Sequence, residues 1–164
     1  MIVTAELVET ARYVLGAFQA AGQTIATAES CTGGLVAALL TDIPGSSAVF
    51  ERGFVTYSNA AKIEMLGVSP ATLEAVGAVS EAVCREMAEG ARARAGASLA
   101  VAISGIAGPG GSEFKPEGRV CFALAGPSDT TTQTVEFGAL GRAQVRHAAR
   151  DHALTLLRDG LIAL

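Results

Sequence analysis

A short polar segment, ESCTGG at residues 29–34, lies between two apolar runs and places two types of nucleophile side by side. Ser30 follows a strand-like run and precedes a helix-like run, so the backbone must turn sharply at this point. A side chain on such a turn lies at the sheet edge near the unpaired N–H groups of the next helix, which can hold an oxyanion or a phosphate. The segment is therefore either a nucleophile site or a cap at Ser30 or Thr32 followed by packing glycines.

Cys31 competes with Ser30 for the role of nucleophile. A thiol at the N-terminus of a helix has a depressed pKa, and the thiolate is the reactive form, so Cys31 is the alternative nucleophile. Adjacent residues on a turn point in different directions, so one of the two faces a given site. On the local sequence both nucleophiles remain open.

The segment TYSNAAKIEMLG, residues 56–67, contains the best candidate for the base that a serine nucleophile requires. If Asn59 caps a helix, Lys62 lies in the first turn, where the helix macrodipole disfavours a cation. We therefore expect a lowered pKa for the Lys62 amine, as a lysine general base needs. Tyr57, at the end of the preceding strand, can relay a proton or orient the pair. The plainer interpretation is that Lys62 is one more exposed lysine on a helix.

A glycine-rich segment, SGIAGPGGSEFKPEGRV at residues 104–120, follows a continuous apolar run typical of a strand buried on both faces. Ligands of open α/β sheets bind beyond the ends of such strands, so the segment is either a binding loop or a mobile connection. Lys115 and Arg119 bring positive charge to an otherwise acidic chain.

Three arginines, Arg142, Arg146 and Arg150, are spaced four apart and share one helical face. This spacing predicts a solvated basic face. The alternative is an arginine in the first helical turn that binds an anion.

Neither the cysteines nor the histidines form a metal-binding pattern. The three cysteines lack CxxC spacing, and the two histidines lie five positions apart in a helix-like segment, so they do not share a face. The same spacing makes His147 and His152 poor partners for a serine. We expect no metal and no other cofactor, and we expect Cys84 and Cys121, which lie among apolar residues, to belong to the core.

The composition of the whole chain indicates one compact domain. Its 164 residues are 50% hydrophobic with a mean hydropathy of +0.41, yet no run approaches the roughly 18 apolar residues of a membrane helix. A net charge of -4 and a pI near 5.2 argue against nucleic-acid binding, and the first residues lack the layout of a signal peptide. We expect a single cytoplasmic domain over residues 1–164, without membrane or nucleic-acid partners.

Helix-like and strand-like segments alternate along the chain. Short apolar or β-branched runs predict strands at residues 24–28, 48–57, 99–106, 119–125 and 131–137. Periodic apolar positions with capping signals predict helices at residues 5–21, 35–40, 59–66, from 70, 81–95, and from 141 nearly to the C-terminus. This interleaving is typical of a layered α/β fold.

Nearly the whole chain resembles the CinA C-terminal domain family, the nicotinamide-nucleotide amidohydrolases. The pairing of AESCTGG with TYSNAAK is specific to it, and the similar segments occur in the family's order. These segments are TIATAESCTGGLVAALLTDIPGSSAVF, GFVTYSNAAKIEMLGV, GAVSEAVCREMAEGARA, AVAISGIAGPGGSEFKPEGRV and GRAQVRHAARDHAL. The resemblance implies a single-domain three-layer α/β/α sandwich with a mixed central sheet, a homodimer or higher homo-oligomer, and no metal.

The same resemblance implies an activity, the deamidation of nicotinamide mononucleotide to nicotinic acid mononucleotide with release of ammonia. Larger CinA proteins add an N-terminal domain with pyrophosphatase-type activity that has no counterpart in this sequence, so we expect the amidase part alone. Some members carry only the label of competence-damage proteins. The alternative is therefore a catalytically inactive module that binds a nucleotide or a protein partner.

By position, the resemblance implies Ser30 as the nucleophile, Lys62 as its base and Tyr57 as a supporting hydroxyl. It also implies contacts to substrate from the ESCTGG segment, from the turn that begins at Ser104, from the family's loop motif and from a late arginine. The implied substrate-binding residues are Cys31, Thr32, Gly33, Gly34, Ser104, Gly105, Ile106, Ala107, Gly108, Lys115 and Arg142. Ser104 stands where the family has threonine, and this change keeps the hydroxyl.

Overall fold

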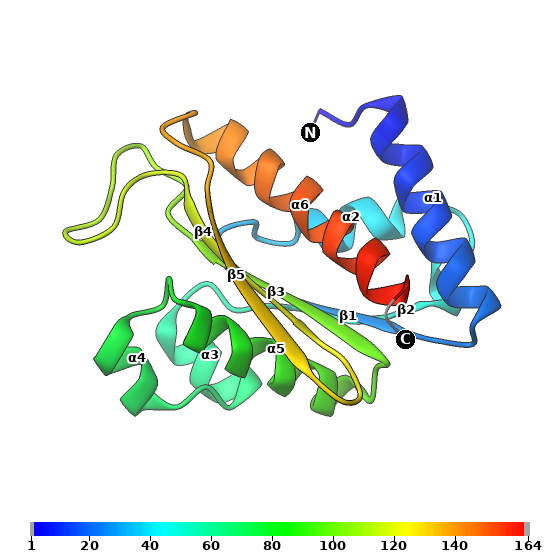
Figure 1. Cartoon of the computed structure of the whole chain (residues 1–164), viewed down its shortest axis with the longest axis horizontal. Coiled ribbons are helices and arrows are strands. Elements are labelled where there is room, and N and C mark those ends of the chain that lie inside the picture. The colour runs from blue at the N-terminus through cyan, green and yellow to red at the C-terminus, as the bar shows by residue number, and fades with distance from the viewer. Residues whose placement is uncertain (1, 163–164) are drawn as a thin grey trace.

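The computed structural model describes residues 2–162, in which five strands form one mixed sheet between two layers of helices (Figure 1). The strands are β1 (Ile25–Glu29), β2 (Phe50–Val55), β3 (Leu99–Gly105), β4 (Arg119–Ala125) and β5 (Thr130–Glu136). Their spatial order is β2-β1-β3-β4-β5. The first three run parallel, whereas β4 is antiparallel to β3 and β5 is antiparallel to β4. The predicted three-layer fold with a mixed sheet is confirmed.

Helices cover both faces of the sheet (Figure 1). One layer contains α1 (Ala5–Ala20), α2 (Leu35–Thr41) and α6 (Arg142–Ile162). The other layer contains α3 (Asn59–Leu66), α4 (Pro70–Val76) and α5 (Glu81–Ala95). Within residues 2–162, no helix has the length and apolar character to cross a membrane.

The two faces of the sheet carry side chains of different size, because successive residues of a strand point to opposite faces. Towards α1, α2 and α6 the strands present branched and aromatic residues, among them Ile25, Val101 and Phe122. Towards α5 they present mainly alanines, such as Ala28 and Ala102. Small side chains let α5 pack closely on the sheet, so the same strands support a bulky core on one side and a tight one on the other.

Several element boundaries differ by a residue or two from the sequence predictions, and two differences concern the elements beside Ser30 and Lys62. The strand predicted over residues 48–57 is shorter, because Ser46–Ala48 forms a turn of 3-10 helix before β2 begins. The cap of α3 is Ser58 rather than Asn59: the Ser58 hydroxyl accepts a hydrogen bond from the Ala61 amide at 3.0 Å. Lys62 nevertheless lies at the start of the helix, as predicted.

Candidate active site

Ser30 lies directly beyond the carboxyl end of β1, at the edge where the parallel strands end. Its amide donates a hydrogen bond to the Ile103 carbonyl of β3 at 2.9 Å, so the residue is still tied to the sheet. The chain then turns through Gly33 and Gly34, whose positive φ angles of 59° and 100° suit glycine. The sharp turn predicted at this point therefore rests on these two glycines.

Lys62 reaches Ser30 from the first turns of α3. Its Nζ atom donates hydrogen bonds to the Ser30 Oγ at 3.0 Å and to the Thr56 carbonyl at 2.7 Å. The side chain is only 1% exposed, and this burial lowers the pKa of the Lys62 amine below its ordinary value. The pair thus has the contact and the lowered basicity that a serine nucleophile and a lysine base require. The interpretation of Lys62 as an exposed helix lysine is wrong.

Ser30 and Lys62 face a pocket of about 220 Å³ at this edge of the sheet. Its walls come from the ends of β1 and β3, from the segments before α3 and α5, and from the start of α6. The lining residues are Ser30, Cys31, Tyr57, Asn59, Lys62, Ala78, Val79, Ser104, Gly105, Ala107 and Arg142. A concave site with a nucleophile and a buried base at strand ends is the usual place for ligands in such folds.

Glu29 occupies the helix N-terminus that the sequence predicted as an open anion site. Its buried carboxylate accepts hydrogen bonds from the amides of Val36 at 2.9 Å and Ala37 at 3.0 Å. The cap position of α2 is Gly34, so neither Ser30 nor Thr32 caps the helix. The expectation that these amides bind an anion of the substrate is therefore wrong, because the carboxylate of Glu29 already binds them.

Cys31 lines the pocket, but its thiol is not activated. Burial raises the pKa of the Cys31 thiol to about 11 and outweighs the lowering effects of a backbone hydrogen bond and of the nearby Arg146. The expectation of a depressed thiol pKa is wrong because the side chain is desolvated and α2 begins beyond it, at Leu35. Cys84 and Cys121 are buried in the core as predicted.

Tyr57 and Arg142 bind each other at the wall of the pocket. The Tyr57 hydroxyl accepts a hydrogen bond from Arg142 Nη2 at 2.7 Å, and Arg142 Nη1 donates to the Gly108 carbonyl at 2.8 Å. Tyr57 is 60% exposed. Its hydroxyl is thus bound to the guanidinium, whereas the Lys62 amine is bound by Ser30 and the Thr56 carbonyl.

The other predicted substrate-binding residues are distributed over three places. Ser104, Gly105 and Ala107 line the pocket with Ser30. Ile106 and Lys115 line a neighbouring pocket instead, where Lys115 Nζ donates to the Val76 carbonyl at 2.7 Å and the Val79 carbonyl at 2.6 Å. The remaining four residues line neither of these two pockets: Thr32, Gly33, Gly34 and Gly108.

The three arginines of α6 do not form the solvated basic face that their spacing predicted. Arg150 is buried and donates to the Ile2 carbonyl at 3.1 Å. Arg146 donates to the carbonyls of Cys31 and Thr32, at 3.1 Å each. Arg146 therefore braces the turn that follows Ser30, a role that helical spacing alone does not reveal.

Sequence reasoning missed several groups of the site. The Thr56 carbonyl and the side chains of Ala78 and Val79 carry no chemical signal in the sequence, since their roles depend on position alone. Glu29 did carry a signal, because a carboxylate at the end of a buried apolar strand must find hydrogen-bond donors.

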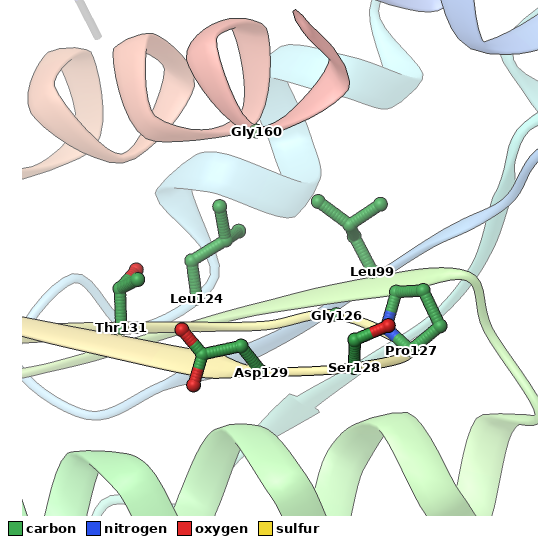
Figure 2. A pocket seen from close by; sticks show the side chains of 8 residues that line it. All are labelled: Leu99, Leu124, Gly126, Pro127, Ser128, Asp129, Thr131 and Gly160. Atoms are coloured by element: carbon green, nitrogen blue, oxygen red, sulfur yellow. The ribbon is translucent and has the colours of Figure 1, made fainter. Parts of the chain in front are cut away.

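A separate pocket of about 180 Å³ lies at the other end of β3, between the β4–β5 turn and the last turns of α6 (Figure 2). Aliphatic side chains such as Leu99 and Leu124 form much of its wall, and Asp129 is the single ionisable residue that lines it. Its lining contains no pair of nucleophile and base like that of Ser30 and Lys62.

The chain is similar to known proteins in both sequence and structure. The chain is 54% identical over 153 residues to the nicotinamide-nucleotide amidohydrolase PncC of Escherichia coli K12, covering 93% of each chain. It is 45% identical to a competence/damage inducible protein from Agrobacterium tumefaciens, whose crystal structure superposes with a TM-score of 0.93 over 97% of this chain and 98% of that one.

Other relatives are much longer proteins. The chain spans 35% of a putative competence-damage inducible protein from Symbiobacterium thermophilum, to which it is 54% identical over 86% of its own length. It spans 37% of a CinA-like protein from a Synechococcus species, to which it is 50% identical. The model of the CinA C-terminal domain matches residues 8–161. The chain therefore belongs to the CinA C-terminal domain family.

Proposed function

We propose that this protein is an amidohydrolase that converts nicotinamide mononucleotide to nicotinic acid mononucleotide and ammonia. The observation that carries the proposal is the 3.0 Å hydrogen bond between Lys62 Nζ and Ser30 Oγ inside a pocket. The relative from Escherichia coli named as a nicotinamide-nucleotide amidohydrolase supports it, because the identity extends over 93% of both chains.

The first half of the reaction forms an acyl-enzyme. Ser30 Oγ attacks the carboxamide carbon of the substrate while the neutral Lys62 amine takes the hydroxyl proton. The tetrahedral intermediate then collapses, and the Lys62 ammonium returns that proton to the departing nitrogen, which leaves as ammonia. The Thr56 carbonyl holds the amine in place throughout.

The second half of the reaction hydrolyses the ester. A water molecule attacks the acyl carbon, and Lys62 takes a proton from that water. The bond to Ser30 Oγ breaks, the proton passes to the serine oxygen, and nicotinic acid mononucleotide leaves. One lysine thus serves as base and acid in both halves.

A carboxamide is a weak electrophile, so its developing oxyanion needs hydrogen-bond donors. The amides of Val36 and Ala37 are bound to Glu29, and the Gly33 amide donates to the Ser30 carbonyl at 3.0 Å. We assign the oxyanion contact to the amide of Cys31, because Cys31 follows the nucleophile and lines the pocket.

Tyr57 and Arg142 act as supporting groups in this proposal. Arg142 holds the Tyr57 hydroxyl at the pocket wall, where both side chains can contact the substrate. Ser104, Gly105 and Ala107 form the opposite lining, at the end of β3. No cofactor enters the mechanism.

We also propose that the protein acts in the cytoplasm as a homodimer or higher homo-oligomer. Half of its residues are hydrophobic, and Val55, Ile63 and Met65 are exposed around β2 and α3. Its three cysteines are free thiols, which persist in a reducing compartment.

Ammonia release from nicotinamide mononucleotide tests the function and its nucleophile together. We expect Ser30→Ala to lower kcat by about a thousandfold or more, because the covalent route is lost. We expect Cys31→Ala, the matched control one position away, to stay within about tenfold of the parent, since a buried neutral thiol takes no part in the chemistry.

The opposite pattern, with activity lost only in Cys31→Ala, would keep the amidohydrolase and overturn the Ser30 mechanism. A folded parent protein that binds the mononucleotide and releases no ammonia would instead establish the alternative, an inactive nucleotide-binding module. Turnover of free nicotinamide at the same rate would refute specificity for the nucleotide.

A further inference from the structure

A second pocket of about 590 Å³ adjoins the site of Ser30 and Lys62. The two pockets share Ala78 and Val79, in the short segment between α4 and α5. Ile106, which continues the β3 strand past Gly105, lines the second pocket. The two pockets therefore adjoin at this segment.

The sizes of the two pockets indicate which part of the proposed substrate lies in each. Sites for small organic ligands enclose about 300–1,000 Å³, and the first pocket, of about 220 Å³, is smaller than this range. The carboxamide must lie at Ser30 Oγ, so the pyridine ring fills the first pocket. The ribose and phosphate must then extend beyond it, and the second pocket has the room.

Lys115 is the one cation among the residues that line the second pocket. Two of its ammonium hydrogens have partners, because Nζ donates to the Val76 carbonyl at 2.7 Å and to the Val79 carbonyl at 2.6 Å. An ammonium group has three donors, so one remains for a ligand. The half-buried side chain is thereby fixed at the pocket with a positive charge and a free donor.

Two other features of this wall fit a ribosyl phosphate. α5 begins just beyond Val79, and its 15 residues place the positive end of the helix next to the shared wall. Glu74 is the one carboxylate in the lining and is exposed on α4, where its oxygens can accept hydrogen bonds from hydroxyl groups such as those of ribose.

Arg142 is the competing cation, because it lines the first pocket. Both terminal nitrogens of its guanidinium are already engaged, with the Gly108 carbonyl at 2.8 Å and the Tyr57 hydroxyl at 2.7 Å. Three of its five N–H donors are not used by these two bonds, but Arg142 is not among the residues that line the second pocket. It therefore lies beside the pyridine ring in the first pocket, whereas Lys115 lies where the phosphate must extend.

We infer that Lys115 binds the phosphate group of the substrate in the second pocket and so determines the preference for a nucleotide over its nucleoside. This inference rests on the proposed function. Discrimination between the nucleotide and the nucleoside then depends on Lys115. The Ser30–Lys62 pair cannot discriminate between them, because the reacting carboxamide is the same in both molecules.

The test compares nicotinamide mononucleotide with nicotinamide riboside, which lacks only the phosphate. We expect Lys115→Met to raise KM for the mononucleotide by about tenfold or more while KM for the riboside and both kcat values stay near those of the parent. Lys115→Arg keeps the charge and should retain the preference. Arg85→Met is the matched control, because it removes the same charge at a place outside both pockets. Arg85 pairs with Glu89 at 3.6 Å on the exposed side of α5.

An equal loss for both substrates in Lys115→Met would overturn the inference, since it would show that the lysine only ties its loop to the two carbonyls. An unchanged KM for the mononucleotide would overturn it as well. If the parent releases no ammonia, the proposed function fails. The inference is then decided by calorimetry: a higher Kd for the mononucleotide in Lys115→Met than in the parent supports it, and an equal Kd overturns it. If Lys115→Met does not fold, weaker competition by inorganic phosphate in Lys115→Gln than in the parent supports it, and equal competition overturns it.

Discussion

Burial acts in opposite ways on the two ionisable side chains beside Ser30. Desolvation favours the neutral form of any group, so it lowers the pKa of the Lys62 amine and raises that of the Cys31 thiol to about 11. A neutral amine is a base, whereas a neutral thiol is a weak nucleophile. The same desolvated environment therefore favours the basic, neutral form of the Lys62 amine and the unreactive, neutral form of the Cys31 thiol.

At the scale of this residue pair, the pH dependence of kcat/KM should follow the Lys62 amine. Because Lys62 must be neutral to take the Ser30 proton, activity should rise as the pH increases through its pKa. Burial places that pKa below the value of an exposed lysine, so the midpoint should lie below about 10.4. Ammonia release from nicotinamide mononucleotide across a pH series measures this profile.

Lys62→Arg is the matched variant for this profile, because it keeps the positive charge and cannot lose its proton. We expect its kcat to fall by about a hundredfold to ten-thousandfold and its rising limb to disappear. A parent profile that is flat or falls with increasing pH would contradict the assignment of Lys62 as the base.

At the scale of elements, Lys62 depends on the contact between α3 and α5. Gly90 lies inside α5, and a Cβ atom at this position would overlap the carbonyl oxygen of Leu66, the last residue of α3. The absence of a side chain therefore permits the close approach of the two helices. Since Lys62 lies in α3, this approach also places the base beside Ser30.

Two glycine-to-alanine variants separate this packing role from helix propensity. Gly16 lies inside α1 with nothing near its missing Cβ, so Gly16→Ala should stabilise the fold by about 0.5–1 kcal/mol. Gly90→Ala should destabilise it by about 1–3 kcal/mol, because α3 must move away, and should also lower kcat. Urea denaturation of both variants measures the difference, and a stabilised Gly90→Ala would contradict the close contact.

At the scale of the whole molecule, the site is assembled from segments far apart in the chain. Ser30 and Lys62 are 32 positions apart, and Tyr57 and Arg142 are 85 positions apart. Parallel β1 and β3 end at the same edge of the sheet, and the segments that follow them meet there. The start of α6 adds Arg142 to the same edge, so segments from Ser30 to Arg142 contribute to one pocket.

The bond between Tyr57 and Arg142 leads to a prediction at this scale. Tyr57→Phe keeps the ring and removes the hydroxyl that accepts from Arg142. Because that hydroxyl is bound to the guanidinium rather than to Lys62, we expect kcat for nicotinamide mononucleotide to stay within about tenfold of the parent. Steady-state kinetics measure it, and a loss as large as that of Lys62→Arg would show instead that Tyr57 relays the proton.

Much of the fold could be predicted from local patterns. Periodic apolar positions with a serine cap predicted α5 from residue 81 to 95, and the run from Leu99 predicted a strand buried on both faces. Both signals act within a few residues, which is why they can be read from the sequence. The family resemblance added the three-layer arrangement with a mixed sheet, which periodicity alone does not distinguish from other layered folds.

The sequence by itself determined which groups are available, namely Ser30 on a glycine turn, Lys62 at the start of a helix and Lys115 in a glycine-rich loop. The tertiary structure alone decided what each of them contacts. It buried Lys62 against Ser30, bound the amides at the N-terminus of α2 to the Glu29 carboxylate, and placed Lys115 in the neighbouring pocket. The physical reason is that desolvation and hydrogen-bond partners depend on atoms brought together from distant parts of the chain, and these set the protonation and reactivity of every group in the site.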